Sequence, residues 1–225
     1  DAGFVRNIRN SSPVKTYLKQ WNTVVRRGPL LLQKKDKQTT GVIGLDAVID
    51  GGYPKGSVVI VTGSPLSGIE HVARQFWRVE VEGGVYLMID GDVEEEMVDS
   101  RNLNPDAFPG YYKGKRIVVD SLSSVILNSG IDDAIQCLLL ARKEAFRENS
   151  TIMFLLYNNI HKPEDENRIF RIADVVLELK VVTFATEVER QLAVHKLRQG
   201  NVPKRLIPFN ITDKGIELST TSRVV

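Results

Sequence analysis

Residues 56–70 constrain the fold of this chain more than any other stretch. Five consecutive apolar or β-branched residues, 58–62, predict a buried central strand. A loop bounded by glycines follows, and residues 71–77 predict a helix. This order of elements is typical of a phosphate-binding loop, in which a Gly, four residues, a second Gly, a Lys and a Ser or Thr follow one another.

The loop keeps the glycines of that pattern and loses its two chemical residues. Gly63 and Gly68 stand at the glycine positions, Ile69 replaces the Lys, and Glu70 replaces the Ser or Thr. The Lys normally neutralises phosphate charge and the hydroxyl holds Mg²⁺, so both changes oppose nucleotide binding, by several kcal/mol or on the order of a thousandfold in affinity. The alternative is that the Glu70 carboxylate itself ligates Mg²⁺. The residues between the two glycines are Ser64, Pro65, Leu66 and Ser67.

The rest of the main domain alternates between strand and helix patterns, which predicts a mostly parallel sheet covered on both faces. A short helical turn is expected at 45–50, strands at 85–90, 116–120, 151–157 and 175–179, and helices at 94–101, 131–148 and 163–173. The end of the chain changes character and predicts antiparallel strands at 187–196, 205–211 and 216–218.

The first 38 residues differ from the remainder in charge. They hold nine Lys or Arg residues against two Asp, a net of +7, so the remainder carries +2 − 7 = −5. Residues 13–27 have apolar side chains at helical spacing and predict an amphipathic helix, followed by a charged linker. We therefore expect two parts: a basic N-terminal helix and linker at 1–38, and a core domain at 39–225. The basic part is either a solvated helix face or a surface for a partner or nucleic acid.

Composition excludes several classes of protein. A single cysteine, Cys137, rules out an intrachain disulfide and a multi-cysteine metal site, and its apolar neighbours predict a buried thiol. The three histidines are scattered without metal-ligand spacing, so no metal site is predicted. No run of 18 apolar residues and no signal-peptide pattern occurs, and we expect a cytoplasmic protein without a membrane partner.

Five motifs in order resemble one known group of proteins. They occupy residues 40–46, 51–57, 118–122, 193–200 and 208–216, and the loop lies between the second and the third of these ranges. Their order and spacing are similar to those of the RecA superfamily of ATPases, and within it the KaiC-like group, over about residues 39–218. The resemblance implies an α/β, three-layer RecA-like P-loop fold with antiparallel C-terminal strands, here with an N-terminal helical extension. It also implies ATP and Mg²⁺ as the cofactors to test.

The same resemblance assigns roles outside the loop. Asp90 matches the carboxylate that activates the attacking water, and Asp120 matches the Walker B carboxylate that orients Mg²⁺. Lys196 and Arg198 match residues that reach a neighbouring subunit's nucleotide in family rings. Each also has a simpler interpretation: Asp90 caps a turn, Asp120 is a buried hydrogen-bonded carboxylate, and the two cations are exposed charges on an edge strand.

Three functions are compatible with these observations. The leading hypothesis is a non-hydrolysing pseudo-ATPase that acts in assembly or regulation, as a homo-oligomer or with a related RecA-like protein. The second is an ATP-binding protein or ATPase with an atypical loop. The third is a nucleic-acid accessory protein, similar to recombinase paralogues, which would use the basic residues 1–38.

Overall fold

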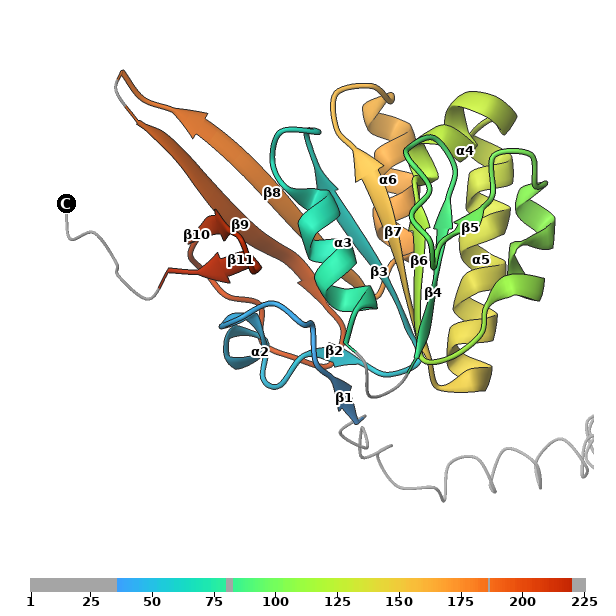
Figure 1. Ribbon diagram of the computed structural model, residues 1–225, viewed down its shortest axis with the longest axis horizontal. Coiled ribbons are helices and arrows are strands. Elements are labelled where there is room, and N and C mark those ends of the chain that lie inside the picture. Colours follow the sequence, from blue (N-terminus) through green and yellow to red (C-terminus); the bar gives the residue numbers. More distant parts are fainter. Residues whose placement is uncertain (1–35, 80–82, 186, 220–225) are drawn as a thin grey trace, which may run out of the picture. The chain divides into compact units, whose positions relative to one another are not determined.

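The computed structural model describes residues 36–79, 83–185 and 187–219. These residues form a nine-stranded mixed sheet with helices packed on it (Figure 1). The strand order is β11-β10-β9-β8-β3-β7-β6-β4-β5. The parallel strands are β3 (Ser57–Gly63), β4 (Gly84–Met88), β5 (Val98–Asp99), β6 (Arg116–Asp120), β7 (Thr151–Tyr157) and β8 (Val175–Thr183). The antiparallel strands are β9 (Val188–Leu197), β10 (Ile207–Thr212) and β11 (Gly215–Leu218). This confirms the predicted mixed sheet.

Strand β3 lies at the centre, between β7 and β8, and every one of its residues is buried. Its side chains alternate between two separate hydrophobic clusters: Val59 and Val61 belong to one, and Val58 and Ile60 to the other. This alternation follows from the two-residue period of a strand. A continuous apolar run is therefore required here, because both faces of the strand are covered.

Helices cover the two faces. α3 (Ile69–Trp77) contributes buried side chains to the Val59 cluster, whereas α5 (Ile131–Glu148) and α6 (Pro163–Ile172) contribute to the Val58 cluster. The arrangement gives three layers, with α4 (Leu122–Ser129) and α5 on the same side of the sheet (Figure 1). No helix in the described ranges is long and apolar enough to cross a membrane.

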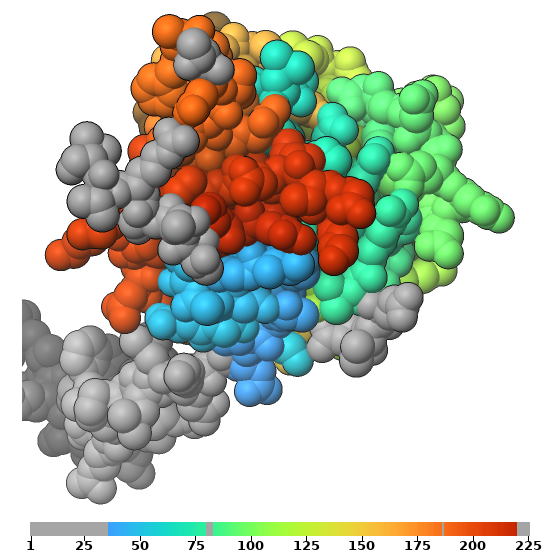
Figure 2. Space-filling view, turned by 60° about the vertical axis from the view of Figure 1, so that its left-hand side comes forward, coloured from blue at the N-terminus to red at the C-terminus, as the bar shows by residue number. Residues whose placement is uncertain are grey.

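The beginning of the described chain packs against its end. β1 (Lys37–Gln38) and β2 (Tyr53–Pro54) form a small antiparallel pair, and α2 (Leu45–Val48) lies between them in sequence. The backbone N–H of Leu218 donates to the carbonyl of Ile43 at 3.0 Å. Figure 2 shows this early segment directly beside the C-terminal strands, so the two ends together close one side of the sheet.

The sequence predicted several elements closely. The strands at 116–120 and 151–157 and the helix at 131–148 have the predicted bounds. The antiparallel hairpin after Thr212 is also confirmed, with Thr212 opposite Gly215. The predicted N-terminal helix at 13–27 lies outside the described residues, whereas Lys37–Gln38 of the expected linker forms β1.

The predicted helix at 94–101 is wrong. A turn, in which the Met97 N–H donates to the Glu94 carbonyl at 2.9 Å, leads directly into β5. Val98 then pairs with Leu87, and the Ser100 N–H donates to the Met88 carbonyl at 2.7 Å. Successive glutamates in this segment form no apolar stripe, so pairing with the edge of β4 is favoured over a helix. The sequence analysis also missed α4 and the 3₁₀ helix η3 (Pro105–Tyr111).

Candidate functional site

The loop after β3 is closed by its own hydrogen bonds. Both the backbone N–H and the side-chain hydroxyl of Ser67 donate to the Ser64 carbonyl, at 3.0 and 2.6 Å. Ser67 is fully buried, and a Cβ on Gly63 would collide with its oxygen. Gly68 has a φ of 90°, which favours glycine and turns the chain into α3. Leu66 lies at the exposed tip of the loop, with 78% of its surface accessible.

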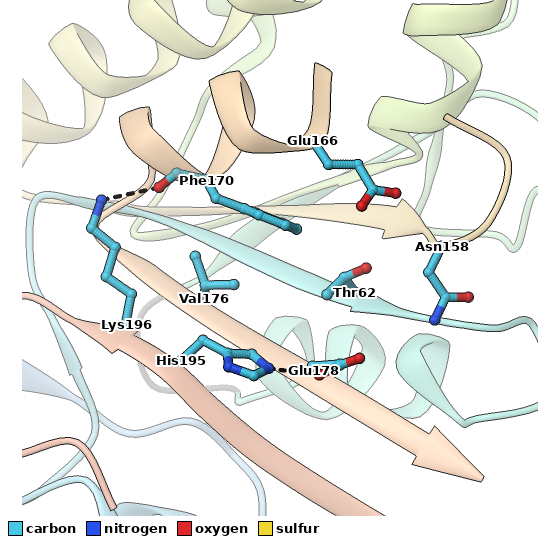
Figure 3. Close-up of a pocket in the computed structure, with 8 residues that line it drawn as sticks. All are labelled: Thr62, Asn158, Glu166, Phe170, Val176, Glu178, His195 and Lys196. Atoms are coloured by element: carbon cyan, nitrogen blue, oxygen red, sulfur yellow. Dashed lines mark hydrogen bonds and ion pairs between the residues drawn. The ribbon is translucent and has the colours of Figure 1, made fainter. Parts of the chain in front are cut away.

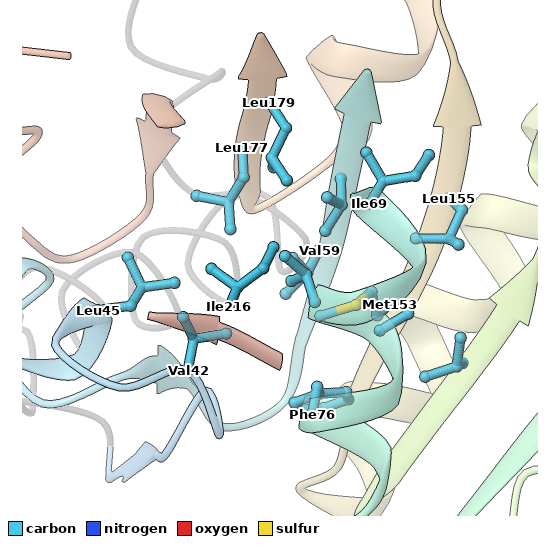
Figure 4. Packing of buried hydrophobic residues seen from close by; sticks show 14 of the residues in the cluster. Val42, Leu45, Val59, Ile69, Phe76, Met153, Leu155, Leu177, Leu179 and Ile216 are labelled. Atoms are coloured by element: carbon cyan, nitrogen blue, oxygen red, sulfur yellow. The ribbon is translucent and has the colours of Figure 1, made fainter. Parts of the chain in front are cut away.

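The Ile69 side chain lies in the core and does not extend over the loop. It is fully buried in the hydrophobic cluster that also contains Val59, Leu155 and Leu179 (Figure 4). Its Cγ2 atom lies 2.8 Å from where a Cβ on Gly63 would stand, directly below the end of β3. The residue at the lysine position of the motif is therefore part of the packing between α3 and the sheet.

Glu70 is half-buried and contacts a tyrosine from a neighbouring strand. The Tyr157 hydroxyl, at the end of β7, donates to Glu70 Oε1 at 3.3 Å. Burial raises the pKa of Tyr157, and the charges of Asp120, Glu70 and Asp90 raise it further. These three acids, Glu70, Asp90 and Asp120, lie near one another and are called the carboxylate cluster below.

Asp120 ends β6 and is only 4% exposed. The Tyr86 hydroxyl donates to its Oδ2 atom at 2.6 Å. Burial is the largest influence and raises the pKa of Asp120 to about 6, although the Tyr86 hydrogen bond acts in the opposite direction. The predicted buried, hydrogen-bonded aspartate is confirmed in this geometry. A Mg²⁺-orienting role stays a prediction.

Asp90 follows β4 and accepts a short hydrogen bond from the Ser124 hydroxyl. Ser124 belongs to the first turn of α4, whose N-cap is Ser121, and the two serine hydroxyls lie 2.9 Å apart. Each acid of the carboxylate cluster thus accepts a hydrogen bond from a hydroxyl of this chain. Among the described residues, no group of three or more His, Cys, Asp or Glu side chains is arranged to hold a metal ion.

The sequence analysis missed Arg74, a cation beside this cluster. Arg74 lies one helical turn after Glu70, forms an ion pair with Glu94 at 3.0 Å, and acts to lower the pKa of Asp120. Its Nε atom is buried without a hydrogen-bond partner. Its i,i+4 spacing from Glu70 is the signal in the sequence that could have identified it.

Lys196 and Arg198 lie elsewhere on the molecule. Lys196 Nζ donates to the carbonyls of Phe170 and Arg171, both at 3.0 Å, in the last turn of α6. Arg198 forms an ion pair with the buried Asp174 at 2.7 Å. These contacts are at the beginning of β8, whereas β3 ends beside Leu179, further along β8, and the loop follows from there. Within one chain the two cations therefore do not reach the carboxylate cluster, and a role on a neighbouring subunit is untested.

The strand order, with the loop after β3 and acids after β6 and β4, defines a RecA-like P-loop protein. The chain belongs to the KaiC ATPase family: the family model described as "ATPase: KaiC" matches residues 109–223, just over half of the 225. The matched residues include Asp120, Lys196 and Arg198 and begin after the loop. The predicted KaiC-like family is thus confirmed, whereas the loss of function in the loop stays a prediction.

Individual relatives are distant. The chain is 24% identical over 225 residues to the circadian clock oscillator protein KaiC of Thermostichus vulcanus, covering 82% of this chain but only 43% of KaiC. It is 25% identical over 230 residues to a UPF0273 protein of Pyrococcus furiosus, covering 79% and 91% of the two chains. A solved KaiC-like protein of Pyrococcus horikoshii superposes with a TM-score of 0.70 at 22% identity, over 82% and 99% of the chains. The chain therefore spans less than half of the length of KaiC and nearly all of the smaller relatives.

Proposed function

We propose that this protein is a non-hydrolysing member of the KaiC family, which acts in assembly or regulation and does not turn over ATP. The observation that carries the proposal is the buried position of Ile69. An apolar side chain at this point contributes to the core, and a lysine there would have to leave the core before it met a phosphate.

The charges around the loop support the same proposal. Glu70, Asp90 and Asp120 bring negative charge toward the region that a triphosphate occupies in the family, and each is already hydrogen-bonded within the chain. The residues present do not fit the family's usual magnesium nucleotide, because a carboxylate replaces the Mg²⁺-binding hydroxyl and an isoleucine replaces the phosphate-binding lysine.

Calorimetric titration with ATP and Mg²⁺ tests the proposal. We expect no saturable heat with the wild type, and a return of binding in the Ile69→Lys/Glu70→Thr double variant. Glu70→Thr alone serves as an intermediate that keeps the core intact, and circular dichroism verifies that each variant is folded. Tight binding of Mg-ATP by the wild type would overturn the proposal.

An ATPase with an atypical loop is the second candidate. It is favoured by the family's description as an ATPase and by the retention of Asp90 and Asp120 at adjacent strand ends. This candidate requires Lys196 and Arg198 to act on a neighbouring subunit. Magnesium-dependent turnover that is lost in Asp120→Ala would establish it in place of the first proposal.

The assembly role concerns partners directly. We propose self-association, or association with a related RecA-like protein, in which residues 13–27 supply the apolar contact. Sedimentation of the full chain and of a chain lacking residues 1–38 tests this: a strict monomer in both cases would contradict it. Binding to single-stranded DNA with a steep salt dependence would instead favour the nucleic-acid accessory function.

A further inference from the structure

A cavity that none of the three acids of the carboxylate cluster lines lies between α6 and the strands β8 and β9. Its volume is about 450 Å³, within the usual range for small-ligand sites. Val176 and Thr62 form its floor on the sheet, and Phe170 and Glu166 face them from α6 (Figure 3). The cavity therefore has an apolar base, an aromatic ring and a carboxylate on one wall. We call it the α6 pocket.

Glu166 and Phe170 share one face of α6 because they are four residues apart. In the described part of the chain, the Glu166 carboxylate has no hydrogen bond or ion pair. Burial raises its pKa, and the charge of Glu178 on the opposite wall raises it further. A positive charge beside Glu166 would offset both effects, because it favours the ionised carboxylate.

Glu178, on the β8 side of the pocket, already has two partners, and although burial acts to raise its pKa, its hydrogen bonds to His195 and Lys180 lower it. His195 Nε2 and Lys180 Nζ both contact the same oxygen of Glu178, Oε2, at 2.6 and 3.0 Å. In the described ranges, the second oxygen, Oε1, accepts no hydrogen bond and forms no ion pair. Lys196 also lines the pocket, but its ammonium group is directed to the carbonyls at the end of α6 and does not meet Glu166 (Figure 3).

We propose that the α6 pocket binds an organic cation, with an alkylammonium or guanidinium head at Glu166 and an apolar body over Phe170. A charged donor on a carboxylate makes the stronger kind of hydrogen bond, and an aromatic face attracts a cation. Glu178 supplies a second acceptor, and Val176 and Thr62 receive the apolar body. An anion would meet the Glu166 carboxylate, whereas the Lys196 ammonium is already held by the Phe170 and Arg171 carbonyls, so we expect the pocket to prefer cations.

Agmatine, a guanidinium linked to an amine by a butyl chain, is a suitable probe. Calorimetric titration at low ionic strength should give saturable binding to the wild type, weakened about tenfold or more in Glu166→Gln. Glu164→Gln is the matched control, because Glu164 lies in the same helical turn but is exposed. Phe170→Leu should weaken binding while keeping the pocket apolar. No saturable binding, or equal affinity in Glu166→Gln and the wild type, would overturn the proposal.

A cation of this kind can be a small molecule or a Lys or Arg side chain of a second copy, and sedimentation distinguishes the two. If agmatine dissociates an assembly of the wild type and Glu166→Gln fails to assemble, the head group belongs to a second copy. If agmatine binds without changing the sedimentation coefficient, the ligand is a small molecule. The agmatine titration depends on the α6 pocket and not on ATP binding at the loop, whereas the sedimentation outcome rests on the self-association proposed above.

Discussion

Two acidic regions of this chain differ in whether their carboxylates accept hydrogen bonds from the chain itself. In the carboxylate cluster, Glu70, Asp90 and Asp120 each accept a hydrogen bond from a hydroxyl of the same chain. In the α6 pocket, the Glu166 carboxylate has no such partner among the described residues, and Glu178 is contacted on one oxygen only. A satisfied buried group contributes to stability, whereas an unsatisfied group at a cavity has binding capacity left.

This difference bears on how the family fold is used here. The edge of the sheet that holds the nucleotide motif is filled by internal contacts, from the buried Ile69 to the Tyr157 hydroxyl. The α6 pocket, by contrast, is an open cavity lined by the carboxylate of Glu166, unpaired within the described ranges. Substitutions in the carboxylate cluster and at Ile69 should therefore change stability, and substitutions in the α6 pocket should change binding.

The largest effect is expected from Ile69→Lys. A charge at this fully buried position should lower the free energy of unfolding by about 3–5 kcal/mol, because no partner compensates it. Urea denaturation measures the change, and Glu70→Thr is the neighbouring control with an effect below about 1 kcal/mol. An unchanged stability of the lysine variant would show that the side chain reaches solvent across the loop, which would favour the nucleotide-binding interpretation.

Asp120→Asn should change stability in a pH-dependent manner. The pKa of Asp120 is raised to about 6 in the folded chain, against about 3.9 in an unfolded one. Between these values the folded state binds more protons, so this group's contribution to stability is present at low pH and is lost as pH rises through 6. The wild type should therefore lose up to about 3 kcal/mol relative to Asp120→Asn between pH 4 and pH 7.5.

Urea denaturation of both proteins at several pH values measures this difference. Asp92→Asn provides the control, because Asp92 is an exposed residue of the loop that follows β4. A constant difference between Asp120→Asn and the wild type over this pH range would contradict the assignment of a buried, proton-binding carboxylate.

Much of the fold was predictable because it depends on local patterns. The apolar run of β3 and the glycines around the loop were enough to place the central strand, and alternating strands and helices gave the layers. The helix predicted at 94–101 failed because strand pairing with β4, a contact outside the segment, determines its structure. The residues of the segment alone do not indicate which strand it will pair with.

The site was predictable in part, for the same reason. Ile69, Glu70, Asp90 and Asp120 stand out at known motif positions. Their hydroxyl partners come from strands and helices that only the folded sheet brings together, such as Tyr86, 34 residues before Asp120. The α6 pocket was not predicted at all. Glu166 and Phe170 are visible as an i,i+4 pair, but Glu178 and His195 join them only through the pairing of β8 with β9.

Tyr86→Phe tests how much the hydrogen bond from Tyr86 to Asp120 contributes to stability. Loss of the 2.6 Å hydrogen bond leaves Asp120 buried without this donor, which should cost about 1–2 kcal/mol at pH 7.5. Tyr157→Phe is the matched change, with a smaller expected cost because its bond to Glu70 is 3.3 Å long. Equal stability of Tyr86→Phe and the wild type would mean that another group already satisfies Asp120.

The smallest effect on stability is expected from Glu166→Gln. This variant distinguishes the α6 pocket from the carboxylate cluster most clearly. The carboxylate is half-buried and has no hydrogen bond or ion pair to a described group. Its replacement removes one negative charge from the first turn of α6, which is unfavourable, and relieves repulsion from Glu178, which is favourable. The free energy of unfolding should stay within about 0.5 kcal/mol of the wild type, while agmatine affinity falls. A loss of more than 1 kcal/mol would place Glu166 among the structural acids, together with Asp120, and a binding defect could then be attributed to a damaged helix. Stability retained together with lost affinity is the combination that only a ligand-facing carboxylate produces.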